Sequence, residues 1–245
     1  MAITCPGCGR EYDVTLFQFG RTLRCTCGAR VGLEKRIDIE QTAPPRFVAD
    51  VMLGHLARWL RIMGYDTAWP GDGEDEALVR RALEEERILL TRDRRLPAEW
   101  RISNVLLLDD EHPSEQIRAV VDHFALDWKR RLFTRCSRCN EPLERMDAEV
   151  VRARQEERVE QGPPGDTAPP NEAAGRGPDH GARAPVPDDV LARARSFRRC
   201  ATCGRVYWEG SHTERIRARL EGLLEGGPAT GAGRAPADGG SPPDS

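Results

Sequence analysis

Aromatic side chains are scarce in this sequence, and long apolar segments are missing. Only 6% of the 245 residues are aromatic and 39% are hydrophobic, so part of the chain is expected to lie outside any packed core. No apolar run approaches the roughly 18 residues that a membrane-spanning helix needs, and the first residues lack the pattern of a signal peptide. We therefore expect a soluble, cytoplasmic protein with no membrane partner.

A strong net charge is also lacking. The formal charge is −3, which excludes both a polybasic nucleic-acid coat and an acidic tail protein. Large apolar side chains are nearly absent from two segments rich in Gly and Pro, residues 161–187 and 225–245. Such composition cannot offset the entropy lost on ordering. We expect a disordered insert and a disordered tail at these positions.

Eight cysteines fall into four short pairs, a spacing that indicates metal binding rather than disulfides. Two quartets result, Cys5, Cys8, Cys25 and Cys27 in the first, and Cys136, Cys139, Cys200 and Cys203 in the second. Four thiolates suit a closed, structural Zn²⁺ site. We predict two Zn ions, one in an N-terminal zinc ribbon at residues 1–40 and one in a C-terminal zinc ribbon formed by 128–160 and 188–220. Buried reduced cysteines and a redox Cys-x-x-Cys are the competing interpretations.

Between these ribbons, residues 46–127 alternate short apolar runs with amphipathic segments. The runs "RFVAD", "YDTAW", "RILL" and "VLLL" are typical of strands, and residues 51–64, 74–86 and 113–124 have the spacing of helices. Strands that alternate with helices indicate an α/β domain with a parallel sheet.

Carboxylates follow these strands. Asp50 ends the first, Asp93 follows the third, Asp109 and Asp110 follow the fourth, and Asp75 begins a helix expected at the same edge. Ligands of open parallel sheets bind outside the carboxyl ends of the strands. Each aspartate alone is explained better as a helix or turn cap. Together they favour a site for Mg²⁺ or Mn²⁺, which activate water against phosphodiesters.

Basic and aromatic side chains are candidates for nucleic-acid contact, because cations bind phosphate and aromatics stack on bases. On the helix and turn of the α/β domain and around the second cysteine quartet, these candidates are Arg58, Arg61, Arg92, Arg94, Arg135, Arg199 and Trp208. The alternatives are a solvated helix surface for the arginines and a small ribbon core for the aromatics. A single-stranded or structured RNA is the partner that fits the functional interpretation.

The stretches "FVADVMLGHLARWLRIMGYDT", "DEALVRRALEEERILLTRDRRL" and "FRRCATCGRVYWEGSH", with Cys136-x-x-Cys139, resemble the Mut-seven C-terminal RNase family. This family has a PIN-like nuclease domain with a built-in zinc ribbon, and the resemblance runs from about residue 46 to about residue 220.

The resemblance implies a PIN-like parallel sheet flanked by helices and an RNA-cleaving site with Mg²⁺ or Mn²⁺. It assigns metal binding to Asp50, Asp75 and Asp93, and it matches Thr91 to the hydroxyl of the family's Thr-x-Asp motif. The further acid usual in PIN-like nucleases has no clear equivalent, and Asp66, Asp72 and Glu76 are the candidates. A non-catalytic RNA-binding or adaptor protein is therefore the alternative, with the N-terminal ribbon as a substrate- or protein-binding module.

Overall fold

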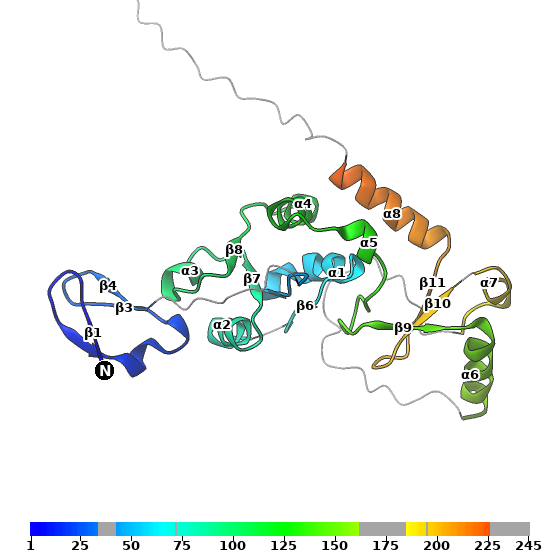
Figure 1. The fold of residues 1–245 in the computed structure, drawn as a ribbon, viewed down its shortest axis with the longest axis horizontal. Helices are drawn as coiled ribbons and strands as arrows, with labels where there is room; N and C mark the ends of the chain where they lie inside the picture. Colours follow the sequence, from blue (N-terminus) through cyan, green and yellow to red (C-terminus); the bar gives the residue numbers. More distant parts are fainter. Residues whose placement is uncertain (34–42, 72, 162–184, 195, 226–245) are drawn as a thin grey trace, which may run out of the picture.

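The computed structural model describes residues 1–33, 43–71, 73–161, 185–194 and 196–225 (Figure 1). Most of the expected insert, the tail beyond residue 225 and the candidate Asp72 lie outside the described residues. None of the helices in the described part of the chain is long and apolar enough to span a membrane.

A four-stranded parallel sheet forms the centre of the molecule. Its strands are β5 (Phe47–Ala49), β6 (Thr67–Ala68), β7 (Ile88–Thr91) and β8 (Val105–Leu107), in the order β6-β5-β7-β8. All three pairings are parallel, with Phe47 beside Ile88 and Leu89 beside Val105. The prediction of an α/β domain with a parallel sheet is therefore confirmed.

Helices cover both faces of this sheet because successive strand residues point to opposite sides. Phe47, Ala49 and Ile88 pack with α1 (Gly54–Ile62) and α4 (Pro113–Phe124). Val48 and Leu89 pack on the other face with α2 (Asp75–Glu84) and α3 (Leu96–Glu99). Strands buried on both faces explain why the runs are continuously apolar rather than alternating.

A close approach fixes the end of α1. Gly64 has φ +88°, and a Cβ there would lie 2.2 Å from the carbonyl oxygen of Arg131. That oxygen belongs to the last residue of α5 (Trp128–Arg131). Glycine is therefore required by conformation and by space, as expected for a helix stop.

The last helix, α8 (Ser211–Leu224), returns to the central domain and packs on α4 (Figure 1). Ile216 and Leu220 join the main core, and Arg118 donates a hydrogen bond to the carbonyl oxygen of Leu223. The sequence assigned residues up to 220 to the C-terminal ribbon. The apolar side of α8 instead completes the core of the central domain.

The C-terminal ribbon is a three-stranded antiparallel sheet of β9 (Leu143–Met146), β10 (Phe197–Cys200) and β11 (Val206–Trp208), with α6 (Ala148–Gln161) and α7 (Asp188–Arg193) beside it. Val186 is buried against Val151, Leu191 and Phe197. The expected disordered insert, residues 161–187, therefore extended too far at its C-terminal end, because Val186 belongs to the core of the C-terminal ribbon.

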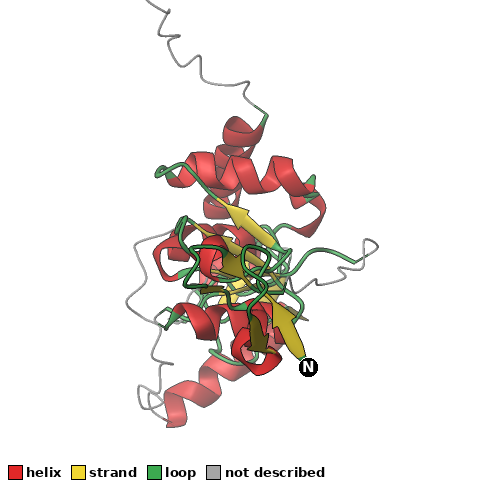
Figure 2. Ribbon diagram, turned by 90° about the vertical axis from the view of Figure 1, so that its left-hand side faces the viewer, coloured by secondary structure: helices red, strands yellow, loops and turns green. Residues whose placement is uncertain are grey.

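The N-terminal ribbon consists of two hairpins, β1 (Ala2–Thr4) with β2 (Glu11–Asp13), and β3 (Leu23–Arg24) with β4 (Arg30–Val31). These two hairpins are coloured blue in Figure 1 and lie beside α2 and α3. Figure 2 shows the molecule turned by 90°. The backbone N–H of Thr22 donates to the carbonyl of Glu99 at 2.6 Å, and that of Arg101 donates to the carbonyl of Gly20 at 2.7 Å. Backbone hydrogen bonds thus join this ribbon to the central domain.

Candidate active site and zinc centres

Asp50 is held at the carboxyl end of the sheet by hydrogen bonds of both its backbone and its carboxylate. Its backbone N–H donates to the carbonyl of Leu90 at 2.9 Å, which extends the β5–β7 pairing by one residue. Its carboxylate accepts from the backbone N–H of Val51 and, at 2.6 Å, from the hydroxyl of Thr91. Asp50 is only 7% exposed and Thr91 is fully buried. The carboxylate therefore has one fixed orientation.

Thr91 connects Asp50 to Asp93. The Thr91 hydroxyl oxygen accepts a hydrogen bond from the backbone N–H of Asp93 at 3.0 Å while its proton goes to Asp50. Asp93 in turn accepts from the backbone N–H of Arg95 at 2.8 Å, and this bond lowers the pKa of the Asp93 carboxyl. The guanidinium of Arg95 lies 3.4 Å away and is 85% exposed. Two aspartates from two strand ends are thereby joined in one hydrogen-bonded chain.

Asp75 faces the same group of carboxylates from the first turn of α2. Burial raises the pKa of its carboxyl, and the negative charges of Asp50, Asp93 and Glu99 raise it further. Beyond burial, the shift reflects repulsion among these carboxylates, which the charge of Arg95 offsets only in part. Glu99, at the end of α3, has no signal in the sequence, since it does not follow a strand.

The capping interpretation holds in part. Asp50 caps the short turn at Val51–Leu53, and Asp93 caps the turn that follows β7, as single aspartates often do. Asp75 does not, because Glu74 occupies the N-cap position and makes no capping hydrogen bond through its side chain. Capping therefore does not explain why Asp75 and its neighbouring carboxylates lie together.

The two described candidates for a fourth acid, Asp66 and Glu76, lie in different places and are both paired. Asp66 precedes β6, at the opposite edge of the sheet from Asp50, and binds Arg87 at 2.6 Å and Asn140 at 2.7 Å. Its charge is compensated there, so it does not join the cluster. Glu76 lies next to Asp75 and pairs with Arg80 at 3.2 Å. Asp109 binds Arg94 at 2.7 Å, on the exposed side of the edge.

The cysteines form two compact quartets. In each, the four Sγ atoms lie within 4.8 Å of one another, and in the described part of the chain no other group of at least three His, Cys, Asp or Glu ligand atoms is this close. The Sγ–Sγ distances of 3.6 Å for Cys5–Cys27 and 3.8 Å for Cys136–Cys203 match the spacing of about 3.8 Å around tetrahedral zinc. Both quartets fit structural zinc sites.

Comparison with known proteins now gives the family. The Mut7-C RNase domain family matches residues 45–163 and 176–220. The chain belongs to this family. A curated relative, the exonuclease mut-7 homolog of Homo sapiens, is 30% identical over 234 residues, which cover 75% of this chain and 26% of the relative. The family match begins at residue 45, so it includes all three aspartates and the second cysteine quartet but leaves out the N-terminal ribbon.

The ribbon of the Mut7-C domain is anchored to the sheet by Arg61. This side chain is 7% exposed, and its guanidinium donates to the carbonyls of Thr67 at 2.8 Å and Arg138 at 2.7 Å. Asn140 completes the anchor by accepting from the backbone N–H of Thr67. The expected phosphate contact of Arg61 is therefore wrong, because its donors are used inside the fold.

The remaining candidates for nucleic-acid contact differ in availability. Arg94 is 75% exposed and Arg92 pairs with Glu111, both on the turn that carries Asp93. Arg58 is partly exposed on α1, whereas Arg135 lies near Asp66 at 4.0 Å. Trp208 is partly buried in the ribbon core, as the structural alternative for the aromatics had it.

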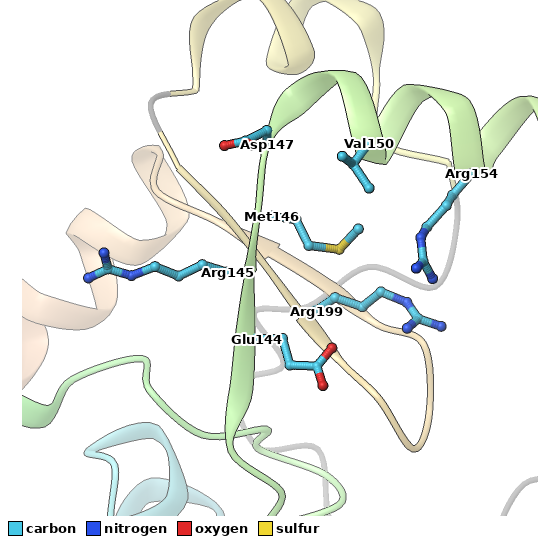
Figure 3. Close-up of a pocket in the computed structure, with 7 residues that line it drawn as sticks. All are labelled: Glu144, Arg145, Met146, Asp147, Val150, Arg154 and Arg199. Atoms are coloured by element: carbon cyan, nitrogen blue, oxygen red, sulfur yellow. The ribbon is translucent and has the colours of Figure 1, made fainter.

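Arg199 lines a pocket of about 330 Å³ on the Mut7-C ribbon (Figure 3). Arg154 and Arg199 extend to the same side of β9, together with Glu144, while Arg145 extends to the other (Figure 3). The pocket therefore offers mixed charge rather than a purely cationic surface.

Zinc content is a direct check on the quartets. The purified full chain should contain two zinc ions, and Cys200→Ser should contain one, because Cys200 is fully buried in the second quartet. Elemental analysis by mass spectrometry measures both. Fewer than two ions in the unmodified protein, or two in the variant, would contradict the pairing.

Proposed function

We propose that this chain is a Mg²⁺- or Mn²⁺-dependent ribonuclease that hydrolyses phosphodiester bonds at the carboxyl edge of the parallel sheet. The observation that carries the proposal is the hydrogen-bonded chain Asp50–Thr91–Asp93 near Asp75, whose pKa is raised by burial and then by its neighbouring carboxylates. Membership of the Mut7-C RNase domain family supports it.

The donor set suits a hard divalent cation. Asp50, Asp75 and Asp93 would hold it through carboxylate oxygens, the ligands that Mg²⁺ and Mn²⁺ prefer. These oxygens are not gathered as tightly as the cysteine sulfurs. Mg²⁺ usually keeps several waters and uses only one or two carboxylates beside the substrate phosphate, so an open arrangement suits it. When bound, such a cation stabilises the charge on the phosphate and activates water for attack on phosphorus.

The side chains of this site have separate tasks. Thr91 keeps the Asp50 carboxylate in place by donating its proton to it, and it is itself fixed by the backbone of Asp93. Asp75 is partly buried among other carboxylates, and a bound cation would relieve their repulsion. Arg92 and Arg94 sit on the Asp93 turn, where they can exchange Glu111 and Asp109 for phosphates of the RNA.

The proposal also covers the cellular compartment and the position of cleavage along the RNA. None of the eight cysteines forms a disulfide, which suits the reducing cytoplasm. The relative is named an exonuclease, and for this chain a comparison of linear and circular RNA decides between attack at ends and internal attack.

The test is cleavage of labelled RNA by the full chain with Mn²⁺, with Mg²⁺ and without either. We expect metal-dependent cleavage, lowered at least about tenfold in Asp93→Asn because one ligand charge is lost. RNA binding in the variant should persist. Equal cleavage by the variant and the unmodified protein would reject the assignment of Asp93. Binding without any metal-dependent cleavage would favour the non-catalytic adaptor.

A further inference from the structure

We infer that the N-terminal zinc ribbon forms one wall of the RNA-binding surface and that Arg21 contacts a phosphate next to the cleavage site. This inference rests on the proposed ribonuclease function. The ribbon lies outside the segment matched by the Mut7-C RNase domain family, which starts at residue 45.

The position of the ribbon is the first argument. Residues 19–22 contact α2 and the end of α3 in the central domain. Thr22 binds the carbonyls of Glu99 and, through its hydroxyl, Ala98. Phe19 lies under the guanidinium of Arg80 at 4.7 Å, on α2. These are the two helices that carry Asp75 and Glu99, so the ribbon is fixed directly beside the acids.

At Arg21 itself the attachment is made by the backbone, so its side chain is not needed to hold the ribbon. Arg21 forms an antiparallel bridge with Trp100, and Gly20 before it has φ +79° and approaches the carbonyl of Arg101 so closely that a Cβ would lie 2.9 Å from it. This geometry holds the chain at Arg21 in one path. Substitution of the Arg21 side chain should therefore leave the ribbon attached.

The guanidinium of Arg21 extends to the first turn of α2, which also carries Asp75. It is 61% exposed and reaches Glu76, the residue after Asp75, at 3.7 Å. Glu76 also binds Arg80 at 3.2 Å, so the pair with Arg21 is the weaker of its two. An exposed ion pair at this distance contributes little, and a phosphate can replace Glu76 as the partner of Arg21.

Charge favours RNA as the occupant. A phosphodiester at this edge meets Asp50, Asp75, Asp93 and Glu99, and repulsion must be offset by cations on the surrounding walls. The described part of the N-terminal ribbon carries more positive than negative side chains, with exposed Arg10, Arg21, Arg24 and Arg30 against Glu11 and Asp13. Arg21 is the one among them that pairs with α2.

The experiment measures binding separately from cleavage. In the full chain carrying Asp93→Asn, the affinity for a labelled single-stranded RNA is titrated by fluorescence anisotropy at several salt concentrations, with and without Arg21→Ala. Each phosphate contact adds about 0.7 to the slope of log K against log salt for single strands. We expect the slope to fall by about this amount, which corresponds to about fivefold weaker binding at 0.1 M salt.

Two matched variants separate phosphate contact from attachment of the ribbon. Arg10→Ala removes another exposed arginine of the same ribbon, at the turn of the first cysteine pair, and should change affinity less than twofold. Glu76→Gln removes the present partner of Arg21. If Arg21 served only to attach the ribbon, Glu76→Gln would weaken RNA binding as Arg21→Ala does. We expect it to strengthen binding, since it frees Arg21 and removes a negative charge.

The outcomes are distinct from those of the cleavage test. An unchanged slope in Arg21→Ala, or equal losses in Arg21→Ala and Arg10→Ala, would overturn the inference and point to a protein partner for the ribbon. A reduced slope together with absent cleavage would retain the RNA-binding wall and reject the ribonuclease.

Discussion

Replacing Asp50 by asparagine should lower metal-dependent RNA cleavage by at least about a hundredfold, the largest catalytic loss expected in this chain. Substitutions of residues that only orient a metal ligand commonly cost about 10- to 100-fold, so loss of a ligand charge should exceed this range. Asp50 is buried at the end of β5, the strand between β6 and β7. No water can easily take the place of its carboxylate there, in contrast to the more exposed Asp93.

The substitution acts on charge rather than on folding. Asparagine keeps one oxygen that can accept the hydrogen bond from the backbone N–H of Val51, which is 2.6 Å long with Asp50. Its amide nitrogen would face the Thr91 hydroxyl, which donates to Asp50 at 2.6 Å and would have to turn into an acceptor. One hydrogen bond to a charged group is lost, at a cost of about 1 to 3 kcal/mol in the free energy of unfolding. Denaturant titration of the variant checks that it remains folded.

Two further variants show whether the loss is specific to Asp50, one with an intermediate loss of cleavage and one with none. Thr91→Val keeps the shape of the side chain and removes the hydroxyl that orients Asp50, so cleavage should fall about 10- to 100-fold. Asp109 follows β8 at the same edge, but its side chain is 69% exposed and paired with Arg94. The variant Asp109→Asn should therefore cleave RNA nearly as well as the unmodified protein. If Asp109→Asn lost as much activity as Asp50→Asn, the active site would lie toward β8 and not at the Asp50–Thr91–Asp93 chain.

The aspartates could be predicted from the sequence because strand ends have a local signal. Ile88 to Leu90 is a continuous apolar run, and a carboxylate soon after such a run falls at the carboxyl edge of a parallel sheet. Asp93 follows from this run of apolar residues, and Thr91 follows from the family resemblance alone. The position of Asp66 could not be predicted in this way, because it precedes a strand of only two residues and lies at the opposite edge.

Residues that reach the site or a core only through contacts between distant segments could not be predicted from the sequence. Glu99 reaches the site because α3 folds back over the sheet, and Val186 becomes part of a core because β10 pairs with β9. Arg61 also had no distinguishing signal. The helix at Gly54–Ile62 is amphipathic and carries two arginines, and only the packed structure shows that Arg61 is buried whereas Arg58 is partly exposed.

Replacing Arg61 by alanine should lower the free energy of unfolding by about 3 to 5 kcal/mol, the largest loss of stability expected from a single substitution outside the cysteines. Burial lowers the pKa of Arg61 to about 10, so the side chain stays charged at neutral pH inside the fold. Its donors hold the carbonyls of Thr67 and Arg138. Without them these two carbonyls lose the guanidinium as a partner, at about 1 to 3 kcal/mol each, and a cavity remains.

The same substitution should loosen the second zinc site. Arg138 lies between Cys136 and Cys139, and Arg61 binds its carbonyl, so the position of this cysteine turn depends on α1. We expect faster transfer of one zinc ion to a colorimetric chelator in Arg61→Ala, while the first quartet, which Arg61 does not contact, releases its ion at the usual rate. Arg58→Ala removes a partly exposed arginine one turn earlier on α1 and should cost less than about 1 kcal/mol. Lower stability with unchanged zinc release would show that Arg61 supports the sheet alone, whereas both changes together mean that the zinc ribbon and the nuclease domain fold as one unit.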